Sequence, residues 1–253
     1  MCPILFKIGP LSLYSYGIMV ALGFAVAIAF IYRRAAEFGL DAEKVIDYAI
    51  LVLITGLSGA RLAYVLLNYG YYSARPAEIF NISKGGLVWY GGFIAAALMS
   101  VWFVRVKRLD FWSASDLVAP YIALAQALGR IGCFLNGCCY GSEAPASYPA
   151  GVIFPEDMVL RHPTQLYSAS ALLLIFVALR LWQDRRHFDG EIFLAYCMLY
   201  ADKRFIVEFL RGDNPKLFLS LTVSQIVSVI LFSAAAGLFM YRSHIWKTGR
   251  STE

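Results

Sequence analysis

The sequence predicts an all-α integral membrane protein with seven transmembrane helices, its N-terminus outside and its C-terminus in the cytoplasm. The first observation is composition: 60% of the 253 residues are hydrophobic and 15% are charged, whereas soluble domains have about 45–50% apolar and about 25% charged residues. The second is a series of long apolar runs, and the third is the placement of lysine and arginine between them. A soluble enzyme, a nucleic-acid-binding module and a disordered chain all need more polar surface than this.

Seven apolar runs are long enough to cross a bilayer, because a hydrocarbon core of roughly 30 Å takes about 20 helical residues. Four runs are free of charge: residues 11–32, 87–104, 164–179 and 217–241. Three carry charges in their interior: residues 45–69, 111–135 and 192–210. We expect one transmembrane domain over residues 1–253. We also expect the first run to be a retained span, since no basic segment or small-residue cleavage site marks it as a signal peptide.

The basic residues predict the orientation, because lysine and arginine gather in cytoplasmic loops. With seven spans, twelve of them fall in the loops on one side and six in those on the other. The richer side is therefore the cytoplasm. Two long segments on the opposite side, near residues 70–86 and 137–163, are expected to form extracytoplasmic loops that cover that face.

Charges inside the apolar runs are the best local evidence of function, because a lysine or arginine at mid-membrane costs about 2.5–3.5 kcal/mol and so faces protein or a wet cavity. In the sixth run, side chains at steps of four, four, four and three share one helical stripe: Tyr196, Tyr200, Arg204, Glu208 and Arg211. Two arginines beside one carboxylate leave positive charge for an anion. The alternative is a structural ion pair that locks two helices. Lys203 lies off the stripe, where a lysine can extend toward the membrane surface.

A second candidate anion site ends the fourth run, in the segment GRIGCFLNGCCYG at residues 129–141. Its four glycines let the backbone turn sharply or approach a ligand. Arg130 has no acidic neighbour in the sequence, which favours phosphate binding over a structural role. For Arg61, in the second run, an anion contact and a hydrogen-bond donor in helix packing are both open. The five cysteines form neither paired CxxC motifs nor an even-numbered framework, so no metal site or disulfide scaffold is indicated.

Other polar residues lie near the outer ends of the spans. The pair Gly91-Gly92, after Tyr90, is more typical of helix packing than of ligand binding. His162-Pro163-Thr164-Gln165 opens the fifth span, with proline suited to a helix start and Thr and Gln available for capping. The unusual polar residues fall in the outer half of the membrane and predict an outward-facing site: Arg130, Asn136, Tyr90, His162, Arg204, Glu208 and Arg211.

These segments resemble the prolipoprotein diacylglyceryl transferases, which lipidate bacterial lipoprotein precursors. Residues 129–141 resemble the family signature, and the other matches follow in order along nearly the whole chain: Tyr16-Gly17, Arg61, Asp116…Pro120, HPTQLY at residues 162–167, and Tyr200…Arg204…Glu208…Arg211. The predicted topology matches the family as well. The resemblance implies a multi-pass protein of the bacterial cytoplasmic (inner) membrane with its active site toward the extracytoplasmic side.

The resemblance also implies the reaction: transfer of the diacylglyceryl group from phosphatidylglycerol to the lipobox cysteine of a prolipoprotein signal peptide, forming a thioether and releasing glycerol phosphate. The family's essential arginines match Arg130 and Arg204, and its paired glutamate matches Glu208. Further expected substrate-binding residues are Tyr16, Arg61, Asn136, Gly141, His162, Tyr200 and Arg211. Since arginines in a low-dielectric cavity can stabilise the leaving phosphate, neither metal nor cofactor is expected. The expected partners are the two substrates and the lipid bilayer, with no nucleic acid.

The chain departs from the usual family pattern at three positions. Tyr90 stands where many members have the histidine of His-Gly-Gly, and a tyrosine with a pKa around 10 is a poor base unless arginines lower that pKa. Candidates for the base are therefore Tyr90, Glu208, His162 and the departing phosphate. Cys133 and Cys138 replace Asn and Glu, so a disulfide between them or lipid modification of a thiol is open. A paralogous transferase with another acceptor and a non-catalytic phospholipid-binding or transport protein are the alternative functions.

Overall fold

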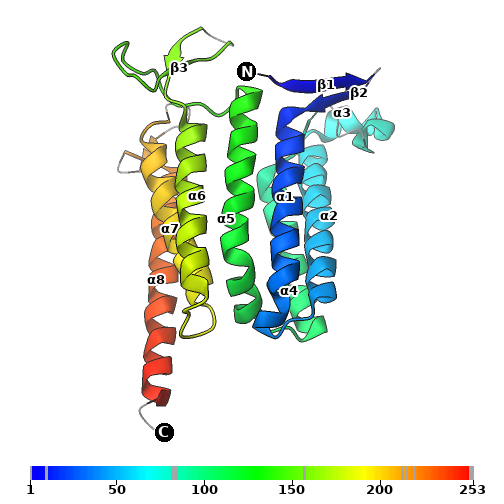
Figure 1. Ribbon diagram of the computed structural model, residues 1–253. Helices are drawn as coiled ribbons and strands as arrows, with labels where there is room; N and C mark the ends of the chain where they lie inside the picture. The colour runs from blue at the N-terminus through cyan, green and yellow to red at the C-terminus, as the bar shows by residue number, and fades with distance from the viewer. Residues whose placement is uncertain are drawn as a thin grey trace. The chain divides into compact units, whose positions relative to one another are not determined.

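The structure is a computed structural model that describes residues 2–8, 11–80, 85–155, 158–211, 214, 216–218 and 220–250. Most of these residues are helical (Figure 1). The long helices are α1 (Ser15–Arg34), α2 (Ala42–Leu67), α4 (Trp89–Lys107), α5 (Phe111–Asn136), α6 (Thr164–Gln183), α7 (Glu191–Glu208) and α8 (Val223–Arg250). The short helices are α3 (Tyr69–Ser73) and the 3-10 helices η1 (Ala35–Phe38) and η2 (Pro76–Phe80).

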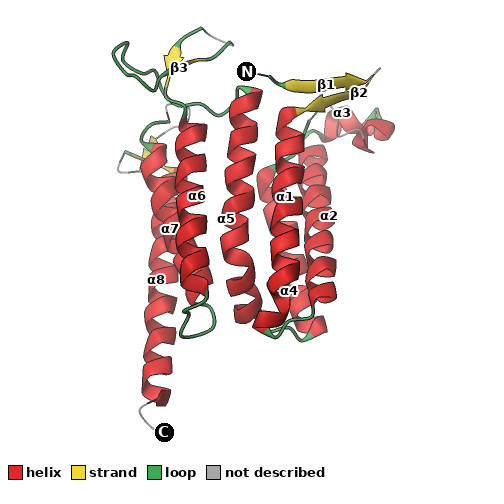
Figure 2. Cartoon of the chain, in the orientation of Figure 1, coloured by secondary structure: helices red, strands yellow, loops and turns green. Residues whose placement is uncertain are grey.

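Three short antiparallel hairpins interrupt the helical chain within the described residues (Figure 2). They pair β1 (Ile4–Ile8) with β2 (Leu11–Tyr14), β3 (Val152–Ile153) with β4 (Leu160–Arg161), and β5 (Lys216–Phe218) with β6 (Leu221–Thr222). The predicted helical architecture is confirmed in its long elements. The strands are a feature that the hydropathy pattern does not reveal.

Six helices in the described part of the chain are long and apolar enough to cross a membrane. The prediction of a multi-pass membrane protein is therefore confirmed in this coarse form. The seventh long helix, α7, has 18 residues but carries five charged ones, so its composition alone does not mark it as a span. The count of seven spans and the orientation stay predictions.

Two of the predicted spans begin too early, since residues 11–14, 217–218 and 220–222 are not helical. Ser15 starts α1, and its buried hydroxyl donates to the backbone carbonyls of Cys2 and Pro3, which ties the β1–β2 hairpin to the helix end. The start of α8 is a capping box. The Thr222 N–H donates to Oε1 of Gln225 (3.0 Å), and the Gln225 N–H donates to Oγ1 of Thr222 (3.3 Å). Local hydrogen bonds thus override an apolar pattern that would allow longer helices.

The chain forms two compact units, Met1–Ile31 with Ser115–Glu253, and Tyr32–Ala114. The core of the first unit lies among α5, α6 and α7. Alanines at every fourth position of α5 (Ala119, Ala123 and Ala127) are fully buried and lie against Leu172 of α6 and Ile192 of α7. Small side chains bring helix backbones close together, which is the main source of helix association in a lipid environment.

Asp116 joins the beginning of α5 to the beginning of α7. Its carboxylate is fully buried and accepts hydrogen bonds from the N–H groups of Gly190 (2.7 Å) and Phe193 (2.9 Å). Those N–H groups have no partner within the helix, and a negative charge is favoured at a helix N-terminus. Gln183 adds a hydrogen bond from Nε2 to the Asp116 carbonyl (2.7 Å). The motif position Asp116 therefore holds the fold of the first unit together.

The second unit is built on the packing of α2 against α4. A Cβ atom placed on Gly91 would lie 2.5 Å from the Gly59 carbonyl oxygen and 2.3 Å from the Ala63 side chain, so only glycine permits this approach. Gly92 also lies close to Gly56, with its Cβ position 2.9 Å from the Gly56 oxygen. The Gly91-Gly92 pair thus serves helix packing, which was the favoured of its two interpretations.

Candidate active site

One end of the helices in the first unit holds nine of the eleven predicted site residues; the other two, Arg61 and Tyr90, belong to the second unit. Helices α5 and α7 end there, and α1, α6 and α8 begin there (Figure 1). This antiparallel arrangement brings motifs together that are up to about 190 residues apart in the sequence, from Tyr16 to Arg204. The candidate site of this unit is therefore built from helix ends.

Arg130 lies in the last two turns of α5 and is half-buried. It forms no hydrogen bond or ion pair with any residue that the structure describes. Its charge acts on Lys203 and on Arg204, both in the second half of α7. Three cations held together away from water repel one another, so this arrangement favours an anion that can bind between them.

Glu208 supplies the negative charge beside this group. The residue is 2% exposed. Its Oε2 lies 3.0 Å from Nη2 of Arg204, while its Oε1 accepts hydrogen bonds from Nδ2 of Asn214 (2.7 Å) and Oγ1 of Thr222 (2.8 Å). Arg204 Nη2 also donates to Oγ of Ser224 (2.7 Å), at the start of α8. The ion pair lies within α7, and its hydrogen bonds to Thr222 and Ser224 link this helix to the beginning of α8. An excess of positive charge remains around Arg130 and Lys203.

Lys203 is a further candidate site residue, one that the predicted stripe does not include. Its side chain does not extend toward the surface, because the residue is 7% exposed and its Nζ lies 4.5 Å from the centre of the Tyr200 ring. Lys203 follows Tyr200 by three residues, and this spacing makes the two side chains neighbours on the helix surface. The sequence therefore contains a signal for their contact. The predicted stripe is also shorter than expected. Arg211 follows the end of α7, in a turn where its N–H donates to the Glu208 carbonyl (3.1 Å).

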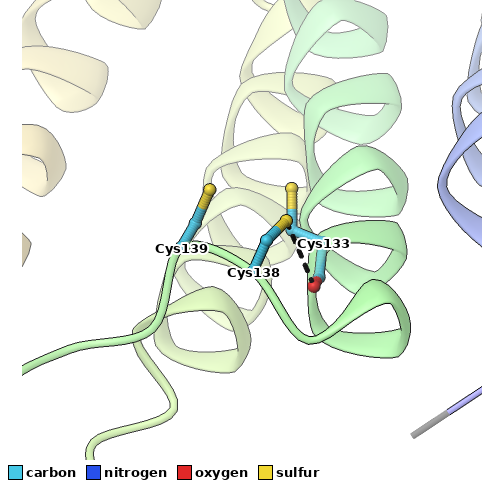
Figure 3. Close-up of side chains that lie close together, drawn as sticks. All are labelled: Cys133, Cys138 and Cys139. Carbon is cyan, nitrogen blue, oxygen red and sulfur yellow. Dashed lines mark hydrogen bonds between the residues drawn. The ribbon is translucent and has the colours of Figure 1, made fainter. Parts of the chain in front are cut away.

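The chain reverses sharply after α5, and this turn gathers three cysteines. Gly137 has a left-handed backbone (φ 77°), and the N–H groups of Gly137 and Cys138 donate to the carbonyls of Phe134 and Cys133, both at 3.1 Å. This is a Schellman cap, in which glycine is the preferred residue. The cap folds Cys138 back over Cys133, with Cys139 next to them (Figure 3). Hydrogen bonds from the thiols of Cys133 and Cys139 lower the pKa of Cys138.

Tyr16 and Asn136 lie beside this turn. Gly132 of α5 packs on the backbone of α1, since a Cβ atom on it would lie 3.3 Å from the Tyr16 Cα and 2.9 Å from the Met19 side chain. The charge of Arg130 and the three thiols all act on the Tyr16 hydroxyl. Asn136 forms a side-chain hydrogen bond with Cys138. Tyr16, Asn136 and Arg130 therefore border one region.

Gly141 and His162 hold the following segment against the helix ends. The Gly141 N–H donates to the His162 carbonyl (2.9 Å), and a Cβ atom on Gly141 would lie 2.5 Å from the Leu210 carbonyl oxygen. His162 Nδ1 lies 3.4 Å from the Tyr167 hydroxyl. Thr164 does not cap α6 with its side chain, which instead donates to the Cys139 carbonyl (3.1 Å). For Gly141 the structure therefore gives a packing role, while its expected part in substrate binding stays a prediction.

Arg61 has a different environment, in the second unit. The residue is 8% exposed, and its guanidinium donates four hydrogen bonds of 2.7–3.1 Å to backbone carbonyls. The acceptors are Glu78, Ile79, Gly85 and Gly86. The rings of Tyr64 and Tyr72 lie within 6 Å of the same group. Of the two interpretations of Arg61, the geometry favours a structural hydrogen-bond donor, which here fixes η2 and the Gly85-Gly86 backbone rather than a helix pair.

Tyr90 lies in the first turn of α4, also in the second unit, and is 66% exposed. It follows the helix N-cap Val88, whose N–H donates to the Ala60 carbonyl (3.0 Å) and so ties the start of α4 to α2. Its predicted role as a base stays a prediction. The predicted extracytoplasmic loops fall partly on residues outside the described part of the chain, at 81–84 and 156–157.

The family model for prolipoprotein diacylglyceryl transferase matches residues 3–241. Similar proteins named phosphatidylglycerol--prolipoprotein diacylglyceryl transferase come from several bacteria. The one from Clostridium tetani is 37% identical over 250 residues, covering 95% of this chain and 97% of its own. That from Bordetella parapertussis is 35% identical and covers 94% of both chains, and that from Lactiplantibacillus plantarum is 33% identical over 96% of this chain and 89% of its own. The chain therefore belongs to the prolipoprotein diacylglyceryl transferase family of enzymes.

Proposed function

We propose that this protein transfers the diacylglyceryl group of phosphatidylglycerol to the thiol of a lipobox cysteine in a prolipoprotein signal peptide. The names of the relatives support both substrates. The observation on which the proposal rests is the excess of cations at the end of α5 and α7. Arg130, Lys203, Arg204 and Arg211 interact electrostatically there, with Glu208 as the carboxylate among them.

This charge fits a phospholipid with a phosphodiester better than a neutral lipid. An arginine can bind two phosphate oxygens at once, and its charge is permanent. Arg130 is half-buried and has no acidic partner among the described residues. A bound phosphate would accept hydrogen bonds from guanidinium N–H groups that are partly shielded from water. Arg204 is positioned by Glu208 and Ser224, which fixes its direction before a lipid binds.

In the proposed step, the thiolate of the acceptor cysteine attacks a glycerol carbon of the lipid. A C–S bond forms, the bond between that carbon and the phosphate oxygen breaks, and glycerol phosphate leaves with one more negative charge. Arg130 and Arg204 stabilise this charge where it develops, which is the kind of interaction that lowers a transition state most. The thiol proton passes to a base, for which Tyr90, Glu208, His162 and the departing phosphate are the candidates.

We also propose that α7 is a seventh span, that the N-terminus is outside the bacterial cytoplasmic membrane, and that the site faces the extracytoplasmic side. The charges of α7 are largely buried or paired: Lys203 and Glu208 are buried, and Arg204 pairs with Glu208. Charged residues in a membrane helix normally face protein in this way. The excess of basic residues in the loops at the other end supports the orientation.

The test is a transfer assay with purified protein, labelled phosphatidylglycerol and a lipobox peptide. We expect a thioether-linked product and glycerol phosphate in equal amounts. Binding of the lipid without transfer would identify a lipid-binding protein, and transfer to another acceptor alone would identify a paralogue. Arg204→Ala should lower turnover by about 100-fold or more. Its control is Arg180→Ala, which removes an exposed pair with Asp184 at the other end of α6 and should leave turnover unchanged.

Tyr90→Phe tests one candidate for the base. Removing a general base typically lowers the rate by about 100-fold or more, and we expect the alkaline limb of the pH–rate profile to change together with the rate. His162→Asn is the matched comparison, because His162 is another candidate for the base. A Tyr90→Phe enzyme whose pH–rate profile is the same as that of the unchanged protein would eliminate Tyr90 as the base.

A further inference from the structure

Three thiols at the end of α5 have no role in the proposed transfer. The Sγ atoms of Cys133, Cys138 and Cys139 lie within 4.8 Å of one another and come from one turn of chain (Figure 3). The geometry points to a binding site for a soft monovalent metal ion, copper(I), held by these three thiolates. The site goes beyond the transfer reaction, and its existence does not depend on that reaction.

The spacing of the sulfur atoms fits a single ion. A metal–thiolate bond of about 2.3 Å places three trigonal ligands about 4 Å from one another. Sulfur atoms that already lie within 4.8 Å need to move by less than about 1 Å. In the described part of the chain no histidine or carboxylate joins the group. Because structural zinc takes four ligands whereas copper(I) accepts three soft thiolates, copper(I) is the better fit.

The surrounding chain fixes the positions of the three cysteines. The Schellman cap at Gly137 returns Cys138 to Cys133, whose carbonyl accepts the Cys138 N–H. On the far side, Gln165 Nε2 donates to the Cys138 carbonyl (2.7 Å) and Thr164 Oγ1 to the Cys139 carbonyl (3.1 Å). These bonds hold the backbone of the turn against α6. Second-shell contacts of this kind preorganise metal ligands.

The charges around the site favour the bound group as well. One copper(I) ion with three thiolates has a net charge of −2, and the site lies beside an excess of cations. Arg130 lies three residues before Cys133 and hence next to it on the helix surface. A neighbouring guanidinium stabilises thiolates. On binding, each S–H bond is replaced by an S–Cu bond and three protons leave to solvent, so no oxidant is needed.

The test is a titration of the full-length protein in detergent under anaerobic conditions. Copper(I) is supplied from its coloured complex with bicinchoninate, and the loss of that colour measures transfer to the protein. We expect one copper(I) per chain and a thiolate-to-copper absorption band in the near ultraviolet. No uptake above that of a variant lacking all three thiols would overturn the proposal, as would tighter binding of zinc(II). Three rather than five free thiols in protein kept anaerobic would also overturn it, since two ligands would then be in a disulfide.

Single variants locate the site. Cys133→Ser, Cys138→Ser and Cys139→Ser should each weaken copper(I) binding by at least about 100-fold, and Thr164→Val by about 10-fold. The matched control is Cys197→Ser, a half-buried thiol in α7 outside the group. Cys139 is exposed, so its variant leaves helix packing intact and tests the site even where Cys133→Ser unfolds. Equal binding by Cys139→Ser and the unchanged protein would overturn the three-thiolate assignment.

Discussion

Arg61 and Arg130 lie in contrasting environments, although both are arginines within apolar helices. Arg61, in the second unit, donates four hydrogen bonds to carbonyls of one loop and lies between two tyrosine rings. Arg130, in the first unit, has no such partner among the described residues and lies near two further cations. Both arginines match family motifs, and both lie within apolar helices.

The difference teaches that a charge in a membrane helix indicates function only when its partners are known. The carbonyls around Arg61 satisfy its donors within the protein, so Arg61 stabilises the loop whether or not a ligand is present. The cations around Arg130 repel one another, and the phosphate that we propose to bind there would reduce this repulsion. We therefore expect substitutions of Arg61 to affect stability and substitutions of Arg130 to affect turnover.

The largest expected effect is that of Arg130→Ala on transfer. Loss of a preorganised donor to a developing charge typically lowers the rate by about 100- to 1,000-fold. The thermal unfolding temperature should not fall, because no hydrogen bond between Arg130 and another described residue is removed. Arg130→Lys should recover part of the rate, since lysine supplies the charge but not the planar pair of donors. Transfer by Arg130→Ala at nearly the normal rate would eliminate the proposed phosphate site.

Arg61→Met should have its main effect on stability. The substitution keeps much of the side-chain volume but leaves four carbonyls without donors, at a cost of about 3 kcal/mol or more, since hydrogen bonds to a charged group contribute about 1.5–3 kcal/mol each. We expect a lower unfolding temperature and faster proteolysis at η2, with nearly normal turnover per folded molecule. A stable Arg61→Met protein that no longer binds phosphatidylglycerol would instead make Arg61 the substrate contact that the resemblance implies.

The sequence predicts much of the first unit's site because its signals are local. The four-residue spacing from Arg204 to Glu208 is a neighbour relation on any helix, and the structure has the pair at 3.0 Å. The glycine in the segment 129–141 that ends α5 is likewise a local signal, and Gly137 has the left-handed backbone that favours glycine. The capping box of Thr222 and Gln225 is also a local signal, but it lies within a long apolar run that predicts one continuous span.

Other features depend on contacts between distant segments and could not be predicted in the same way. Arg61 owes its role to a loop 17–25 residues further along the chain. The cysteine group depends on a turn whose carbonyls are held by Thr164 and Gln165, more than 20 residues away. No spacing rule for metal ligands describes such a turn, so counting cysteine pairs missed it.

The smallest effect is expected for Lys203→Met. This variant distinguishes a residue that stabilises the fold, as Arg61 does, from one that binds the lipid, as we propose for Arg130. Lys203 is buried near Arg130 and Arg204, so removing its charge relieves repulsion and desolvation, while the lost contact with the Tyr200 ring costs about 0.5–1 kcal/mol. We expect a higher unfolding temperature without lipid, and a 3- to 10-fold weaker binding of phosphatidylglycerol, roughly 1 kcal/mol of binding free energy. Lys203→Arg, which keeps the charge, should bind the lipid normally. Weaker binding together with a lower unfolding temperature would mean that Lys203, like Arg61, stabilises the fold. The protein becomes more stable on losing a charge only where that charge is unfavourable in the empty site.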